Sequence, residues 1–177
     1  MGDIKPVCPV KLITGILYSS EASSCAAEKQ LVRFFGRIDY KSEPMAFNFT
    51  NYYAGEMGPV LHRIFLSFKR LMQPGQLAGV KVITNRLERR LAKKSPILKR
   101  VVNIDPGYVT DAKLVLASTK DYGHRIYLSA GIYAEITLCY QKNSFRPHSW
   151  TYPDYAAAEY VNIFNCIRDM FMEQRLG

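Results

Sequence analysis

The stretch QLAGVKVITNRLERRLAKK, residues 76–94, decides the predicted fold. Its apolar side chains recur three and four residues apart, which predicts an amphipathic helix that packs on a core. The apolar stripe consists of Leu77, Val80, Ile83, Leu87 and Leu91. The opposite side is basic and consists of Arg86, Arg89, Arg90, Lys93 and Lys94. Ser95-Pro96 ends the predicted helix, because the residue before a proline avoids the helical conformation.

The residues before this helix predict three strands and one earlier helix. Lys11–Tyr18 is a short apolar run that is typical of a buried strand. Ser19-Ser20 then supplies hydroxyl caps for a helix over about residues 22–35, which ends at Gly36. Two further strands are predicted, at residues 38–40 and 61–69.

After the helix, residues 98–105 are predicted as a strand that enters a turn at Asp105-Pro106-Gly107. The resulting order, strand-helix-strand-strand-helix-strand, is the order of a ferredoxin-like split βαβ core. We expect an antiparallel β-meander to extend this core, followed by a C-terminal helix that Asp154 caps. The meander strands are residues 113–118, 124–128 and 132–140, of which the first also fits a helix. The predicted fold class is therefore α+β, in a single domain over residues 1–177.

The composition is that of an ordinary globular protein, with 48% hydrophobic and 22% charged residues. No apolar segment resembles a signal peptide or a membrane span, so we expect a cytoplasmic protein without membrane contact. The four cysteines are Cys8, Cys25, Cys139 and Cys166. They are scattered and are predicted to be reduced structural thiols, with Cys139 and Cys166 in apolar surroundings. No histidine lies near a cysteine at zinc-site spacing, so no metal site of this kind is predicted.

Several common catalytic signatures are absent from the sequence. It contains neither G-x-x-x-x-G-K-[ST] nor G-x-G-x-x-G, which argues against the common NTPase and dinucleotide-binding architectures. It also lacks G-x-S-x-G, H-E-x-x-H and the paired motifs of zinc deaminases. A serine or cysteine can be matched to a base only when the fold is known, so no nucleophile is assigned.

Polar residues cluster between Asn103 and Glu135, where predicted strands end or turn. The candidate catalytic residues are Asp105, His124 and Glu135. The carboxylates of Asp105 and Glu135 can bind a divalent cation or act as a general base, and His124 can supply positive charge. The candidate ligand-binding residues are Asn103, Lys113, Lys120 and Arg125, which offer an amide and positive charge. The first hypothesis is therefore an enzyme or a binder for a phosphorylated small molecule such as a nucleotide, with a divalent cation as an open cofactor.

A purely structural interpretation of the same residues competes with this hypothesis. In it, Glu135 pairs with Arg125 across a hairpin, Asp105 closes an Asx-type turn, and His124 is an ordinary strand residue. We favour this interpretation on frequency, because structural ion pairs are common and no fixed motif connects these residues.

The formal charge of +9 favours an acidic partner, which gives two further hypotheses. The second is an RNA-binding module that uses the basic face of helix 76–94, although a basic face is more often simply solvated. The aromatic stretch from Phe47 to Tyr53 can stack bases, but such residues more often belong to a core. The third hypothesis is a non-catalytic adaptor or subunit with aromatic residues at its interface. The sequence assigns no oligomeric state.

Five segments carry a resemblance to a known family: NIDPGY (103–108), KLVLASTKD (113–121), HRIY (124–127), GIYAE (131–135) and WTYPDY (150–155). On these segments the chain resembles, from about Val10 to its C-terminus, a prokaryotic family known as domain of unknown function four-four-one-six. The resemblance implies a small, single-domain cytoplasmic protein and assigns no activity. It adds no functional residue to those inferred above.

Overall fold

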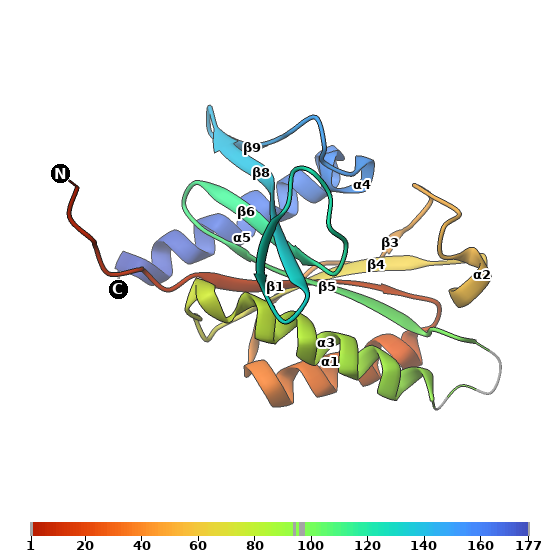
Figure 1. The fold of residues 1–177 in the computed structure, drawn as a ribbon. Helices are drawn as coiled ribbons and strands as arrows, with labels where there is room; N and C mark the ends of the chain where they lie inside the picture. The colour runs from red at the N-terminus through yellow and green to blue at the C-terminus, as the bar shows by residue number, and fades with distance from the viewer. Residues whose placement is uncertain (1, 94, 96–97, 177) are drawn as a thin grey trace.

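The computed structural model describes residues 2–93, 95 and 98–176, which form an antiparallel sheet with helices on both faces (Figure 1). The first half of the chain contains β1 (Lys11–Tyr18), α1 (Glu21–Phe35), β2 (Ile38–Lys41), β3 (Met45–Ala46), α2 (Ala54–Met57), β4 (His62–Phe68), the 3-10 turn η1 (Pro74–Gln76) and α3 (Leu77–Ala92). The second half contains β5 (Val102–Val109), β6 (Lys113–Ser118), β7 (Ile126–Ser129), β8 (Ile132–Gln141), β9 (Ser144–Pro147), α4 (Pro153–Ala156) and α5 (Ala158–Leu176). The predicted α+β class is confirmed.

The strands form one sheet in the order β2-β4-β1-β5-β6-β8-β7, with β3 on β4 and β9 on β8. From β1 to β5, around helices α1 and α3, the sequence order is strand-helix-strand-strand-helix-strand. The small elements β3 and α2 lie between β2 and β4. In the sheet β1 lies between β4 and β5 and is antiparallel to both. β1 is buried along its whole length, as its continuous apolar run suggests, because helices also cover both faces of the sheet.

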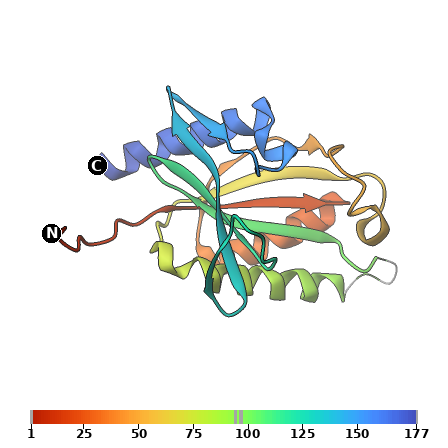
Figure 2. The same ribbon diagram turned by 45° about the horizontal axis from the view of Figure 1, so that its top comes forward.

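Two apolar cores lie on opposite faces of this sheet. Helices α1 and α3 cover one face, where they pack on Ile16, Leu66 and Ile104. Helix α5 covers the other face and packs on Ile13, Phe65 and Leu138. Figure 2 shows the two layers of helix separated by the sheet. Predicted helix 76–94 is confirmed as α3 with its apolar stripe inward, and Lys94 lies outside the described residues.

Three predicted features are wrong. Asp105-Pro106-Gly107 is the middle of β5 and not a turn. The three strands after it do not follow one another as a meander, because β8 lies between β6 and β7. Asp154 lies inside the short helix α4 and not at the cap of the closing helix. Ala157 is extended (φ −63°, ψ 139°) and separates α4 from α5, which frees the Asp154 side chain for another partner.

Candidate functional site

A local separation of two strands creates an opening in the sheet. β6 pairs with β5 only at residues 107–109, while residues 102–106 of β5 continue without it. The N–H of Thr110 donates to the carbonyl of Lys113 (2.9 Å), and every second residue of an antiparallel strand donates toward the same neighbour. Pro106 therefore occupies a donor position facing β6 but has no N–H to give. The proline therefore ends the ladder between β5 and β6. Asp105-Pro106-Gly107 still lies within a strand, because β5 remains paired with β1 on its other side.

Helix α3 supplies the hydrogen bonds that β6 leaves unmade. The Lys81 ammonium donates to the carbonyl of Ile104 (2.9 Å), and the N–H of Ile104 donates to Glu88 Oε1 (2.8 Å). Both side chains are buried, and Arg100 binds the other oxygen of Glu88 (2.6 Å). A buried strand edge needs such partners, because an unpaired backbone group away from water is costly. The opening between β5 and β6 is thus stabilised by a helix instead of being closed by a strand.

A cavity of about 580 Å³ lies at this opening, a volume within the range of small-molecule sites. Its floor comes from β4 and β5 and includes Arg63, Asn103 and Asp105. One wall is aromatic and comes from the segment after β3, with Phe47, Phe49, Tyr52 and Tyr53. The other wall comes from the end of β6, the loop after it and β8, with Ser118, Lys120, Tyr122, Arg125 and Glu135. Residues 152–155 complete the rim.

The floor contains a buried arginine between two carboxylates. The Arg63 side chain is 2% exposed, and its Nη1 and Nη2 donate to Asp105 (3.0 Å) and Asp154 (3.4 Å). Asn103 also donates to Asp105 (2.8 Å). Gly15 of β1 leaves the space for this guanidinium, because a Cβ there would lie 3.0 Å from Arg63 Nη1. Burial lowers the pKa of Arg63, but nearby Tyr155, Asp105 and Asp154 outweigh burial and raise it overall.

The two carboxylates of the floor have opposite proton affinities. Burial raises the pKa of Asp105, but the charges of Lys81 and Arg63 outweigh burial, and the pKa lies below its ordinary value. Burial also raises the pKa of Asp154, and here Arg63 only partly offsets the effect, so this pKa lies above its ordinary value. Asp105 is therefore held as a carboxylate, while Asp154 binds a proton more readily than an exposed aspartate.

The wall that contains Glu135 is a second ion cluster. Glu135 is buried, and its Oε2 accepts from Arg125 Nε (2.6 Å) and lies 3.1 Å from His124 Nε2. Arg125 also donates to Ser118 Oγ (2.7 Å) and to the carbonyl of Lys120 (3.0 Å). Burial lowers the pKa of Arg125, but the bond to Glu135 outweighs it and raises the pKa. Arg125 thus ties the 118–125 loop to β8 at the edge of the cavity.

The structure gathers most of the predicted site residues. Asn103, Asp105, Lys120, Arg125 and Glu135 all line the cavity. His124 does not line it but contacts Glu135 and stacks on Trp150 (5.6 Å between ring centroids). Lys113 begins β6, and Ser118 at the cavity ends it, so the two are roughly 17 Å apart along the strand. Lys113 is thus the one predicted residue that the fold places away from the others.

The structural interpretation of these residues is confirmed in one part and wrong in two. The ion pair between Glu135 and Arg125 is present. Asp105 closes no Asx-type turn and instead contacts Arg63, Lys81 and Asn103, because β5 continues past it. His124 precedes β7 and lies in the loop whose tip is held by Arg125, so it is not a strand residue.

Sequence reasoning missed Arg63, Lys81 and Asp154. Each is buried, and each takes part in the floor cluster. The available signal was a charge beside an apolar pattern: Arg63 directly before the apolar run 64–66 of β4, and Lys81 next to the apolar stripe of α3. Such residues are rarely buried unless they are paired.

The aromatic segment and the basic helix face also have defined places. The sequence predicts that the aromatic residues from Phe47 to Tyr53 belong to a core. Phe47 is indeed buried, but Phe49 and Tyr52 are exposed along the cavity wall. Lys120 Nζ lies 4.9 Å from the Tyr52 ring centroid, so the two walls meet there. Arg86, Arg89 and Arg90 are exposed on α3, and Lys93 is exposed at its C-cap. Lys94 is outside the described residues.

Two classes of feature are not found in the described part of the chain. Within residues 2–93, 95 and 98–176, no three His, Cys, Asp or Glu side chains gather in a way that could hold a metal ion. Across the same ranges no helix has both the length and the apolar character needed to cross a membrane.

Fold and site together define an α+β protein with a polar, aromatic-walled cavity at a split in an antiparallel sheet. The chain belongs to the family described as domain of unknown function (DUF4416), whose model matches residues 8–171. No match is found among curated proteins or among solved structures.

Proposed function

We propose that the protein binds a small phosphate-bearing ligand, such as a nucleotide, in the cavity between β5 and β6. The observation that carries this proposal is the charge of the lining, where five cationic side chains accompany three carboxylates. The cations are Arg63, Lys81, Arg100, Lys120 and Arg125, and the carboxylates are Asp105, Glu135 and Asp154. A concave site with excess positive charge concentrates anionic ligands.

Lys120 is the cation best placed to bind a phosphate. The carboxylates of the cavity already pair with Arg63, Lys81 and Arg125, and Arg100 pairs with Glu88. Lys120 has no carboxylate within ion-pair distance among the residues that the structure describes, and its ammonium lies over the exposed Tyr52 ring. Tyr52 and Phe49 offer apolar faces on which a base can stack. A phosphate at Lys120 and a base on Phe49 or Tyr52 would thus lie where the two walls of the cavity meet.

A reaction on the bound ligand would need an acid or a base in the cavity. The sequence indicates Asp105, His124 and Glu135 as candidate catalytic residues. The low pKa of Asp105 suits a general base only poorly, whereas Asp154, with its raised pKa, is better matched to proton transfer. A divalent cation would have to enter with the phosphate, since cationic side chains already occupy the carboxylates.

A thermal-shift screen of nucleoside mono-, di- and triphosphates, with and without magnesium, tests the proposal. A ligand at a hundred times its Kd should stabilise the protein by about 2.7 kcal/mol. Lys120→Ala should weaken binding, while Lys113→Ala is the matched control because Lys113 lies at the far end of β6. If no nucleotide or simple phosphate ester raises the melting temperature, the proposal fails.

RNA binding by α3 is a second proposal, favoured by the exposed and unpaired basic face. Arg86, Arg89, Arg90 and Lys93 have no carboxylate partner within the described residues. Binding through this face should weaken steeply with salt and be lost in a triple Arg86→Ala, Arg89→Ala, Arg90→Ala variant that still binds nucleotide.

A third proposal, an adaptor role, rests on exposed Ile126 and Tyr127 of β7, and a monomer without copurifying partners would contradict it.

We also propose two finer assignments for the chain. The split βαβ core is ferredoxin-like, which is supported by the order β2-β4-β1-β5 with β1 antiparallel to both neighbours. Cytoplasmic location is supported by four cysteines that are all free, as thiols are in a reducing compartment.

A further inference from the structure

Cys139 and His148 form a thiol–imidazole pair outside the cavity. Cys139 Sγ lies 3.2 Å from His148 Nε2, and both residues are partly exposed. The sequence predicts Cys139 to be a structural thiol among apolar neighbours, and nothing in its spacing from His148 indicates a contact. The pair is created by the way the chain turns after β9.

A gap along one edge of β8 holds the imidazole in place. β7 pairs with residues 132–134 of β8, and β9 pairs with residues 138–141. The turn after β9 fills the interval between them. Thr151 Oγ1 donates to the carbonyl of Thr137 (2.6 Å), and Trp150 Nε1 donates to the carbonyl of Ile136 (2.9 Å). The N–H of His148 donates to Thr151 Oγ1 (2.8 Å), so the backbone at His148 is fixed relative to the strand that bears Cys139.

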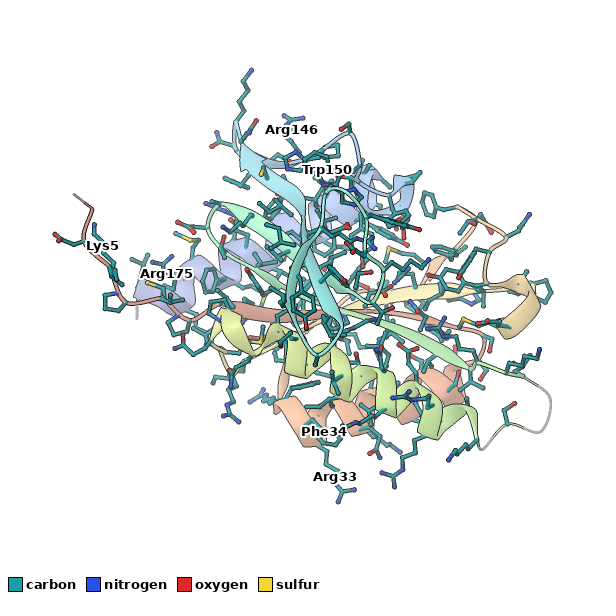
Figure 3. All side chains as sticks on the ribbon, in the orientation of Figure 1. Lys5, Arg33, Phe34, Arg146, Trp150 and Arg175 are labelled. Carbon is teal, nitrogen blue, oxygen red and sulfur yellow. The ribbon has the colours of Figure 1, made fainter. Side chains whose placement is uncertain are left out.

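Basic residues are paired with Cys139 on both neighbouring strands. In the sheet the direct neighbours of Cys139 are Lys113 on β6 and Arg146 on β9. Directly paired residues of adjacent strands project from the same face, so both cations belong to the face of Cys139. Figure 3 labels Arg146 on β9 and Trp150 in the turn that follows it. Cations near a cysteine favour attack by its sulfur, because the nucleophile is the thiolate.

We propose that Cys139 and His148 form a modification site that reacts with low-molecular-weight disulfides. Cys139 Sγ forms a new S–S bond with one sulfur of the disulfide, and the original S–S bond breaks. The other sulfur leaves as a thiolate. The proton of Cys139 passes to His148 Nε2, which acts as the general base, and then to the leaving thiolate or to water. One disulfide is consumed and one thiol is released, with no other oxidant required.

Trp150 reports on the pair directly. Its ring stacks on His148 (centroids 4.5 Å apart, planes at 6°), and it is the single tryptophan of the chain. A mixed disulfide at Cys139 replaces the thiol that now contacts His148 Nε2, and we expect this loss to change the packing of the imidazole against the indole. The intrinsic fluorescence of the protein should therefore change as Cys139 reacts.

The test uses a variant with Cys8→Ser, Cys25→Ser and Cys166→Ser, three exposed positions, so that Cys139 is the remaining thiol. An aromatic disulfide that releases a coloured thiolate gives the rate constant of reaction. We expect Cys139 to react faster in the folded protein than in urea. His148→Ala should lower the rate constant about a hundredfold or more, which is the range for loss of a general base. His62→Ala is the control, since His62 stacks on Tyr18 far along the sheet.

Two outcomes would overturn the proposal: a folded thiol that reacts more slowly than the unfolded one, or a rate constant that His148→Ala leaves unchanged. If His148→Ala does not fold, His148→Asn keeps a polar side chain without a basic nitrogen and must give the same loss. Tryptophan emission that stays constant while coloured thiolate is released would also contradict the assigned geometry.

Discussion

The backbone N–H of Ile104 donates to Glu88 Oε1 over 2.8 Å, so a helix side chain occupies the place that the next strand would take. This bond, with that of Lys81 to the Ile104 carbonyl, satisfies both polar groups of one residue on the free edge of β5. The cavity exists because β6 turns away here. The same bonds therefore stabilise the fold and keep the candidate site open.

Glu88→Ala should destabilise the protein by about 2–4 kcal/mol, since it leaves the buried Ile104 N–H unpaired and removes the partner of Arg100. Urea unfolding measures the loss. Glu28→Ala is the control, because the pair of Glu28 with the exposed Lys41 is worth about 1 kcal/mol or less. Equal losses for the two variants would show that α3 does not support the strand edge.

Gly107→Ala should also destabilise the protein strongly. A Cβ at this position would lie 2.3 Å from the carbonyl oxygen of Val115, a backbone atom that cannot move without disturbing the short β5–β6 ladder. Overpacking of this kind costs about 1–3 kcal/mol or more. Gly79→Ala provides a contrast of opposite sign, because Gly79 is exposed in α3 with open space around it, and alanine there should add about 0.5–1 kcal/mol. Thermal or urea unfolding of both variants measures whether the free energy of unfolding falls for Gly107→Ala and rises for Gly79→Ala.

Most elements could be predicted because periodicity is a local property of the sequence. The apolar stripe of α3 and the apolar run of β1 each point to one structure. Asp105-Pro106-Gly107 could not be read in this way. Proline and glycine mark turns in general, yet here proline ends a ladder on one side of a strand while β1 continues on the other. Only the neighbouring strands distinguish the two cases.

The candidate site was predictable only where its residues are near one another in sequence. Glu135 and Arg125 meet across one loop, so their pairing could be proposed. Arg63, Asp105 and Asp154 come from two strands and a short helix, and no spacing rule connects them. Lys113 was included because it is close in sequence, but β6 carries it away from the cavity.

Arg63→Met should be among the most destabilising single substitutions in the chain. It leaves the carboxylates of Asp105 and Asp154 in a buried site without the cation between them, and breaking a buried pair in this way costs about 3–5 kcal/mol. Arg33→Met, at an exposed position of α1, should change the free energy of unfolding by about 0.5 kcal/mol or less. A loss at Arg63 no larger than at Arg33 would mean that the floor cluster is not formed in solution.

Asp105→Asn should cost more stability at pH 7 than Asp154→Asn, although both residues bind Arg63. Folding lowers the pKa of Asp105, so its ionised form contributes stability that is complete above its unfolded pKa, near 3.8, and is lost as the pH falls through the lower folded value. Folding raises the pKa of Asp154, so its ionised form opposes folding at pH 7, and this cost disappears as the pH falls through the raised value toward 3.8. An amide resembles the neutral acid and so replaces Asp154 better than Asp105.

Urea unfolding at pH 7 and near pH 3 should show that the loss in free energy of unfolding caused by Asp105→Asn becomes smaller in acid. A larger loss for Asp154→Asn at pH 7 would reverse the assignment of which carboxyl the fold keeps charged.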